Sequence, residues 1–443
     1  MKLFYSVLLG CFFIVANNNL LFAQEDFQQE EEEHETKFKQ QPGLAKAASK
    51  VFFSEKPWSV SGFGEVSFVN RNDVPIGMED DIELSYNNLY RFSTFFGYRF
   101  TDKIIWNSEI LVEYLTDPNG NSHFEFIVEA FMDFSIHKSF NLRTGIYPLS
   151  IGYINNNDEP VMFASVNRSD VERMIVPSTW MGMGVSFYGL ISPSFNYTFG
   201  VSQGLDGSSF LSGTWIRQGR EPRFDGNSFT TYSINPQINY VGLKDWTLSA
   251  SAFIGQTGNN QEITDYNGNK RIANSVAQLY TAYVKHTKKN WEFMALASTG
   301  YMSGTEDLYY LTAQENGGVG QVIANQNIGY LVEGSFDLLS LFNNRSFLRK
   351  KNALIDPHDV KIPLFVRYEY INTHKNYNEK LLMADTNANM VHFNSDIITV
   401  GVNFKPREEI AFKIDYQFRN NRATGPYAAK EDNLLELGIG FIF

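Results

Sequence analysis

The feature that most restricts how this chain can fold is a two-residue alternation of apolar and polar side chains, which recurs along residues 57–443. Residues 90–100 carry mostly aromatic side chains at even positions and polar or small ones at most odd positions, and residues 124–136, 410–419 and 434–443 repeat the alternation. Because successive side chains of a strand point to opposite faces, each segment predicts a strand with one apolar and one polar face. Many such segments of about ten residues favour a transmembrane β-barrel, with lipid outside and water inside, over a soluble β-sandwich.

The last strand predicted in this way, Leu434 to Phe443, ends on an aromatic ring. An open sheet would leave this ring and the strand's backbone edge exposed, whereas a barrel pairs its last strand with its first. We therefore expect the barrel to be closed. A terminal phenylalanine on an alternating strand also resembles the assembly signal of Gram-negative outer-membrane barrels, which implies that Phe443 is recognised by the barrel assembly machinery.

The connections between the predicted strands alternate between short and long. Short ones, such as 101–103 and 288–290, are followed by long polar ones, such as 303–327. This is the turn-and-loop asymmetry of outer-membrane barrels, and about sixteen strands can be counted, a size that leaves an aqueous channel. A long basic connection at 338–360 stands where a short turn is expected, and the sequence does not indicate its role.

The N-terminal part of the chain differs from the rest. Residues 1–23 have a positive start and an apolar core, which predicts a signal peptide for export. Residues 24–56 begin with a run of acidic side chains and have almost no large apolar residue before Val51, so we expect a solvated periplasmic arm, or alternatively an acidic docking segment for a partner or a metal. The one cysteine, Cys11, falls within the predicted signal peptide, so no disulfide is expected. The barrel domain is predicted to span residues 57–443.

Charge and composition exclude some classes of protein. The net charge of −12 argues against a nucleic-acid partner. Aromatic residues make up 15% of the chain although its mean hydropathy is slightly negative, which fits an apolar outer face around a wet lumen. No cofactor and no metal site are expected, because the histidines lack metal-ligand spacing. His374 and His392 flank one long connection and could meet in space, but we expect them to be exposed loop residues.

The third long connection, residues 150–181, is predicted to be the longest. A long third loop in a sixteen-strand barrel is where porins fold a segment inward to narrow the pore, and the alternative is an outward lid with ordinary surface charges. The charged residues that would set the field at such a constriction are Asp158, Glu159, Arg168, Asp170, Glu172 and Arg173. The predicted fold class is therefore all-β: a transmembrane antiparallel β-barrel of about sixteen strands with an inward-folded third loop.

The same region carries a family resemblance. Residues 152–189, which include NNNDEPVMFASVNRSDVERMIVPSTWMGMG, resemble the N-E-P … R-x-x-V-E-R … I-x-P-x-x-W … G-x-G pattern of the phosphate-selective porin O and P family. Residues 366–374 and 399–418 resemble the last strands of that family. The resemblance implies a sixteen-strand homotrimeric porin, surrounded by lipid in the outer membrane of a Gram-negative bacterium.

Turning the polar face of each predicted strand inward gives a set of lumen-facing side chains. They are Arg91, Arg99, Glu109, Glu113, Glu125, Glu129, Asp133, Arg143, Arg367, Glu369, Lys413 and Asp415, with Glu65, Arg419 and Glu436 in addition. Acids outnumber bases in this set, whereas the anion-selective members of the resembling family have many Arg and Lys residues in the pore. The sequence therefore gives no evident phosphate-attracting field.

These features predict an outer-membrane porin for passive diffusion of small ions or solutes, with anions such as phosphate as one candidate class. The alternative is a non-conducting barrel that serves as a binding or structural subunit of a surface or secretion complex. Catalytic residues are not expected. Residues 200–204 match the G-x-S-x-G string of hydrolases, but they lie where a strand enters a loop, and a nucleophile elbow needs a strand-to-helix turn.

Overall fold

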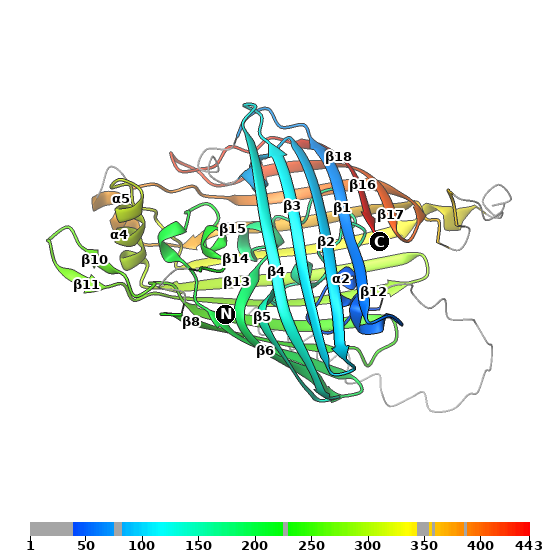
Figure 1. Cartoon of the computed structure of the whole chain (residues 1–443). Coiled ribbons are helices and arrows are strands. Elements are labelled where there is room, and N and C mark those ends of the chain that lie inside the picture. The colour runs from blue at the N-terminus through cyan, green and yellow to red at the C-terminus, as the bar shows by residue number, and fades with distance from the viewer. Residues whose placement is uncertain (1–38, 75–81, 225–228, 343–353, 357–358, 385–387) are drawn as a thin grey trace, which may run out of the picture. The chain divides into compact units, whose positions relative to one another are not determined.

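The computed structural model describes residues 39–74, 82–224, 229–342, 354–356, 359–384 and 388–443, so the predicted signal peptide lies outside the described residues. Sixteen antiparallel strands form one closed barrel (Figure 1). The barrel strands are β1 (Trp58–Val69), β2 (Asn88–Thr101), β3 (Ile104–Thr116), β4 (Ser122–His137), β5 (Phe140–Pro148), β6 (Met181–Ser192), β7 (Phe195–Gln203), β8 (Tyr232–Tyr240), β9 (Trp246–Gln256), β12 (Val276–Lys288), β13 (Trp291–Ser303), β14 (Gln326–Asp337), β15 (Pro363–Asn376), β16 (Asn394–Arg407), β17 (Ile410–Asn421) and β18 (Leu434–Ile442). Within the described residues, no helix has the length and apolar character needed to cross a membrane.

The barrel closes between its first and last strands, as the sequence predicts. In β1 and β18, Phe63 is paired with Ile442. The final residue extends the seam, because Phe443 N–H donates to Gly62 O at 2.8 Å and Gly62 N–H donates to Phe443 O at 3.1 Å. A Cβ on Gly62 would lie 2.1 Å from Ser93 O of β2 and 2.8 Å from the Phe443 ring, so glycine makes room for both the neighbouring strand and the terminal ring.

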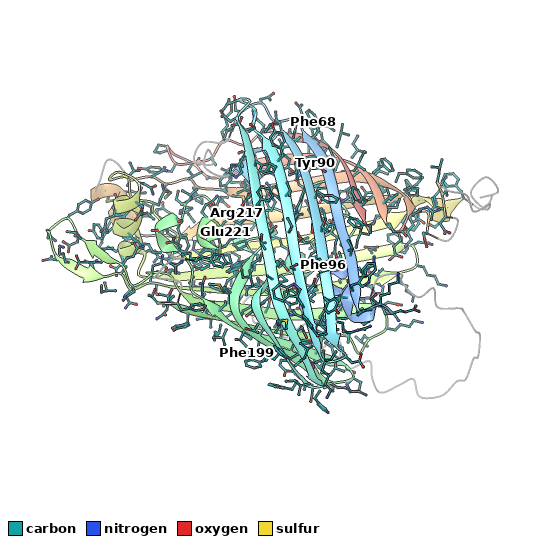
Figure 2. The ribbon with its side chains drawn as sticks, viewed as in Figure 1. Phe68, Tyr90, Phe96, Phe199, Arg217 and Glu221 are labelled. Carbon is teal, nitrogen blue, oxygen red and sulfur yellow. The ribbon has the colours of Figure 1, made fainter. Side chains whose placement is uncertain are left out.

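The two faces of the barrel wall differ as the alternation predicts. Aromatic side chains such as Phe68, Tyr90, Phe96 and Phe199 are between 38% and 49% exposed on the outer face (Figure 2). Many of the intervening residues point inward, are small or charged, and are buried, although Phe63, Phe95 and Phe131 are also buried on the inner face. This arrangement puts apolar rings where lipid would contact the wall and polar groups around the lumen.

The connections also divide as expected into a turn end and a loop end. Short connections, such as those between β2 and β3 and between β12 and β13, lie at the turn end, and the long connections lie at the loop end, except the one between β14 and β15, which is long and lies at the turn end. The loop end carries more regular structure than its polar sequence suggests: α3 (Ile82–Ser85), the hairpin β10 (Glu262–Thr264) and β11 (Lys270–Ile272), α4 (Thr305–Glu315) and α5 (Glu379–Ala384). Helix α4 has Glu306 and Asp307 in its first turn, where the helix dipole favours acidic groups. Short 3₁₀ segments also lie at the loop end at Gly207–Ser209 and Arg217–Gly219, and another, Leu338–Leu341, lies at the turn end after β14.

The prediction that residues 24–56 form a solvated arm is wrong for the described end of this segment. Residues 24–38 lie outside the described residues, but helix α2 (Lys46–Phe53) packs on the inner face of β1, β2 and β3 at the turn end (Figure 1). Leu44, Ala47 and Val51 are at most 1% exposed. A Cβ on Gly97 of β2 would lie 2.4 Å from the Cβ of Val51, so only a glycine lets the helix approach the wall this closely.

Candidate pore constriction

The third loop, residues 149–180 between β5 and β6, crosses the interior of the barrel instead of covering its mouth. It contains two short helical turns, η1 (Ile154–Asn156) and η2 (Val171–Ile175), whose residues are buried. On the far wall, carboxylates accept its backbone N–H groups: Asp415 accepts from Val166 at 2.6 Å, and Glu369 accepts from Val171 at 3.3 Å. These bonds hold the loop against strands far from it in the sequence.

Lysines of the same wall bind the loop's carbonyl groups. Lys413 Nζ donates to the carbonyl oxygens of Phe163 and Ser165 at 2.9 and 2.8 Å. Lys405 Nζ donates to Val161 O at 3.0 Å. Both amino groups are thus turned toward backbone dipoles, which offsets the cost of removing them from water.

The structure brings four of the six predicted constriction residues into charged pairs. Arg168 Nη2 lies 2.6 Å from Asp158 Oδ1, and Arg91 of β2 binds the other oxygen of Asp158. Arg173 Nη1 lies 3.6 Å from Asp170 Oδ1, and Asp170 also binds Arg419 of β17. Burial acts to raise the pKa of Asp170, but the Arg419 and Arg173 charges outweigh it and lower this pKa to about 2. Asp170 is therefore ionised at neutral pH.

The other two predicted residues, Glu159 and Glu172, bind backbone groups instead. Glu172 Oε1 accepts from the N–H groups of Tyr153 and Ile154 at 2.6 and 2.9 Å, which joins the two halves of the loop. Glu159 Oε1 accepts from the N–H of Ala47 in α2 at 2.8 Å. Both carboxyls are at most 2% exposed, and burial raises the pKa of each to about 7 although the N–H bonds act to lower it.

The predicted lumen-facing residues lie on the inner wall. Arg99 and Glu125, near opposite ends of the barrel, are half-buried, and the remainder of the twelve are buried: Arg91, Glu109, Glu113, Glu129, Asp133, Arg143, Arg367, Glu369, Lys413 and Asp415. Arginines pair with neighbouring acids: Arg91 with Glu113 at 2.7 Å, Arg143 with Asp133 at 3.0 Å and Arg367 with Glu369 at 2.7 Å. Most charges of the inner wall are therefore paired with an opposite charge, so the wall does not produce an electrostatic potential of one sign.

One part of the wall is acidic. On β3 and β4, Glu109 lies opposite Glu129, and Glu113 lies opposite Glu125. Like charges placed directly opposite one another destabilise a sheet, so this acidic strip carries an energetic cost. Glu83 of α3 lies near it, with its carboxylate, that of Glu113 and that of Glu125 all within 4.8 Å of one another. Because Glu83 and Glu113 are already paired with arginines, we interpret this group as part of an ion-pair network.

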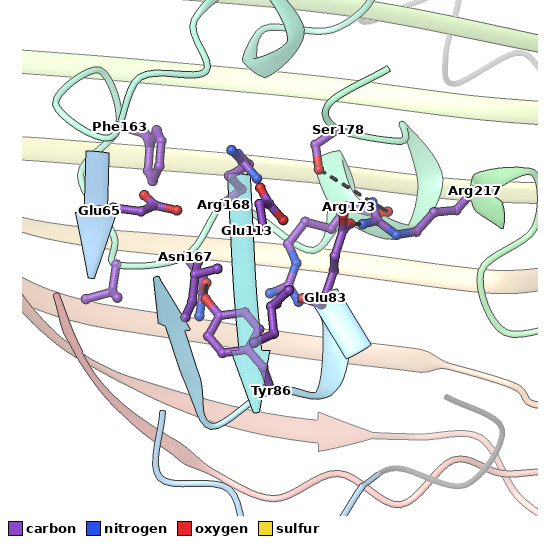
Figure 3. A pocket seen from close by; sticks show the side chains of 13 residues that line it. Glu65, Glu83, Tyr86, Glu113, Phe163, Asn167, Arg168, Arg173, Ser178 and Arg217 are labelled. Carbon is purple, nitrogen blue, oxygen red and sulfur yellow. Dashed lines mark hydrogen bonds and ion pairs between the residues drawn. The ribbon is translucent and has the colours of Figure 1, made fainter. Parts of the chain in front are cut away.

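At the loop side of the constriction, arginines of the third and fourth loops surround Glu83 (Figure 3). Arg217 forms an ion pair with the Glu83 carboxylate, and Arg220 Nη2 lies 3.3 Å from Glu83 Oε2. Arg173 Nη2 donates to the carbonyl oxygen of Glu83 at 3.0 Å. Glu83, Arg217, Arg173 and Arg168 line a pocket beside the third loop. Polar and charged groups from separate loops thus converge on one point inside the barrel.

Comparisons with known proteins agree with this fold. No family model matches the chain. A curated relative, an uncharacterized protein of Aquifex aeolicus (strain VF5), is 24% identical over 408 residues, covering 89% of this chain and 82% of the relative. Among solved structures, the outer membrane channel DcaP of Acinetobacter baumannii superposes with a TM-score of 0.50 at 11% identity, covering 87% of this chain and 97% of that chain. The anion-selective porin of Comamonas acidovorans gives a TM-score of 0.44 at 12% identity, covering 87% and 99%. The likeness to DcaP concerns the fold alone, and the phosphate-selective resemblance stays a prediction.

Glu83, Arg217 and Arg220 were not predicted from the sequence, because the polar residues of the first and fourth loops give little indication that these loops turn inward. Their only signal is the pair of arginines spaced three apart in a polar loop. The prediction that His374 and His392 are exposed loop residues is wrong for His374, which lies in β15, and His392 is half-buried. His374 is 2% exposed, its ring centroid lies 5.5 Å from that of His392, and its Nε2 bonds to Val322 O at 3.0 Å.

Proposed function

We propose that this chain is an outer-membrane channel through which small ions or solutes diffuse passively. The observation that carries the proposal is the third loop, which crosses a closed barrel and is bound by acidic and basic side chains of the opposite wall. Apolar rings on the outer face and charged groups on the inner face support a membrane barrel with a wet lumen. In this proposal the third loop sets the width of the path, and the charges beside it set the selectivity.

The proposed selectivity is weak. The arginines near the third loop would attract anions, but Glu83, Asp158 and Asp170 pair with them. The acidic strip of β3 and β4 would attract cations, and Arg91 partly neutralises it. Fields of both signs lie side by side, so neither sign dominates the path. A strong preference for phosphate is not part of the proposal.

The remaining partners follow from the membrane proposal. The barrel would be surrounded by lipid of a Gram-negative outer membrane and inserted there by the barrel assembly machinery. The homotrimer implied by the family resemblance is included, and crosslinking of the purified protein in detergent tests it. A ladder ending at three subunits is the expected result, and a single monomer band would contradict it.

Single-channel recording tests the function itself. The full chain, purified from membranes, is inserted into a planar bilayer under a potassium chloride gradient. We expect stepwise openings and a reversal potential close to zero. A silent bilayer, from protein that retains strand-dominated circular dichroism and heat-modifiable gel mobility, would favour a second function. This is a non-conducting barrel that binds a partner, and the helix docked inside the lumen is the observation that favours it.

A further inference from the structure

The N-terminal segment, residues 40–53, is held inside the barrel by polar contacts with three different parts of the wall. Asn107 Nδ2 of β3 donates to Ala48 O at 2.6 Å, and Ser61 Oγ of β1 donates to Ala47 O at 2.6 Å. Arg143 of β5 donates to the carbonyl oxygens of Pro42 and Gly43 at 3.3 and 3.2 Å. The segment therefore spans from β1 across to β5 at the turn end.

The segment also contacts the third loop. Glu159 accepts from Ala47 N–H at 2.8 Å, and Gln40 Nε2 donates to Asn156 O at 2.7 Å. Gly43 makes the turn toward α2 with a φ of 71°, and a Cβ there would lie 3.0 Å from Ser150 Oγ of the same loop. The segment thus lies directly under the loop that narrows the lumen, on the path between the constriction and the turn end.

The segment is built for docking that can be reversed. Most of its buried side chains are small, with Ala47, Ala48 and Ser49 between 0% and 2% exposed, and Leu44 and Val51 are the two large apolar side chains that it buries, so a limited apolar surface holds it in place. A helix of eight residues is not stable alone in water, so α2 would unfold once it left the wall. The strands keep every ladder bond without it, because no strand of the barrel is formed by residues 40–53.

We propose that residues 40–53 are a resident gate: docked, they obstruct the turn end of the lumen, and their withdrawal toward that end widens the path. The proposal rests on the channel function proposed above. The alternative is that the segment only braces the barrel wall and has no role in conduction. A brace would matter for stability only, whereas a gate changes conductance when it is displaced and the barrel stays folded.

A larger residue at Gly97 of β2 should push helix α2 away from the barrel wall. A valine suits a strand and would collide with Val51 of α2, and Gly97 has no third-loop atom among the nearest neighbours of its missing Cβ. Gly334 of β14 is the matched control, because a Cβ there would meet nothing within 4 Å. The measurement is single-channel conductance and open probability of the unchanged chain, Gly97→Val and Gly334→Val, each shown by gel mobility to be folded.

We expect Gly97→Val to raise conductance or open probability at least about twofold, and Gly334→Val to match the unchanged chain. Equal conductance in all three proteins would overturn the gate and leave the channel intact. Silence of all three would overturn the channel and the gate together.

A labelling experiment follows the segment without relying on conduction. Cys11 is the only native cysteine, so Ser49→Cys in a Cys11→Ala background supplies a single thiol in the described part of the chain, at a position 0% exposed. Its reaction with a water-soluble maleimide should be at least about tenfold faster when Gly97→Val is also present. An equal, slow rate with and without Gly97→Val would mean that the segment cannot leave the wall, and would overturn the gate.

Discussion

Glu159 of the third loop accepts a hydrogen bond from the backbone N–H of Ala47, the second residue of helix α2, at 2.8 Å. One carboxylate therefore joins the loop that narrows the lumen to the helix at its turn end. Free N–H groups in the first turn of a helix, together with the helix dipole, favour a negative group at this position. The constriction and the N-terminal segment are thus a connected structure, and a change at their junction should affect both.

This junction should make the docking of α2 depend on pH. The pKa of Glu159 is raised from its ordinary value of 4.5 to about 7, because burial and, less strongly, Asp158 raise it more than the Ala47 N–H and Lys46 lower it. If release of α2 lets water reach this carboxyl, its pKa returns toward 4.5. Between pH 4.5 and pH 7 the docked state then holds a proton on Glu159 that the released state has lost. Docking is then tightest in acid and weakens as pH rises toward 7, by at most about tenfold per pH unit for one proton.

Open probability should therefore rise between pH 5 and pH 8. Glu159→Gln keeps an oxygen that can accept from Ala47 N–H but cannot ionise, so it should remove the Glu159 part of this rise. Glu109, Glu129 and Asp158 line the cavity behind α2 and are ionisable as well. Any pH dependence that remains in Glu159→Gln is therefore due to groups other than Glu159. An identical pH profile in the unchanged chain and in Glu159→Gln would contradict the prediction.

Removal of the Glu83 charge should shift ion selectivity toward anions. Glu83→Gln leaves Arg217 and Arg220 without their shared carboxylate, while the amide keeps much of the shape of the side chain. The reversal potential in a potassium chloride gradient should move toward the chloride equilibrium potential. Glu262→Gln in hairpin β10 removes an equal charge from an exposed ion pair with Lys270 and should leave selectivity unchanged. Equal reversal potentials in the two variants would place the arginine group outside the conducting path.

The strands were predictable from sequence, and the site only in part. Alternation along residues 434–443 fixes which side chains face outward whatever the neighbouring strand is, so the barrel and its closure follow from local patterns. The docked helix was not predictable, because Ala47 and Ala48 give little apolar signal next to an acidic run. The pairing of Glu83 with Arg217 joins two loops far apart in the chain, and no spacing in the sequence records such a contact.

The buried pair of Arg143 and Asp133 should matter for stability as well as for docking. Arg143→Met would remove a bond of 3.0 Å and leave Asp133, which is 0% exposed, without its cation. Loss of one partner of a buried pair costs about 3–5 kcal/mol, because the other charge stays buried. The melting temperature in detergent should fall clearly in Arg143→Met and recover in part when Asp133→Asn is added. A double variant no more stable than Arg143→Met would mean that the arginine acts through Pro42 and Gly43 instead.

A substitution at Phe443 can distinguish a role of its ring in assembly from a role in closing the seam between β1 and β18. Phe443 bonds to Gly62 through both its N–H and its carbonyl oxygen, and its ring stacks on that of Phe92 with centroids 6.1 Å apart. Phe443→Ala keeps the two backbone bonds and removes only the ring. If the ring is an assembly signal, this variant should reach the outer membrane of cells at about a tenth of the normal level, measured by fractionation, and still refold in detergent with heat-modifiable mobility. Failure to refold in detergent would instead assign the ring to the seam, and normal levels in cells would show that assembly does not depend on it.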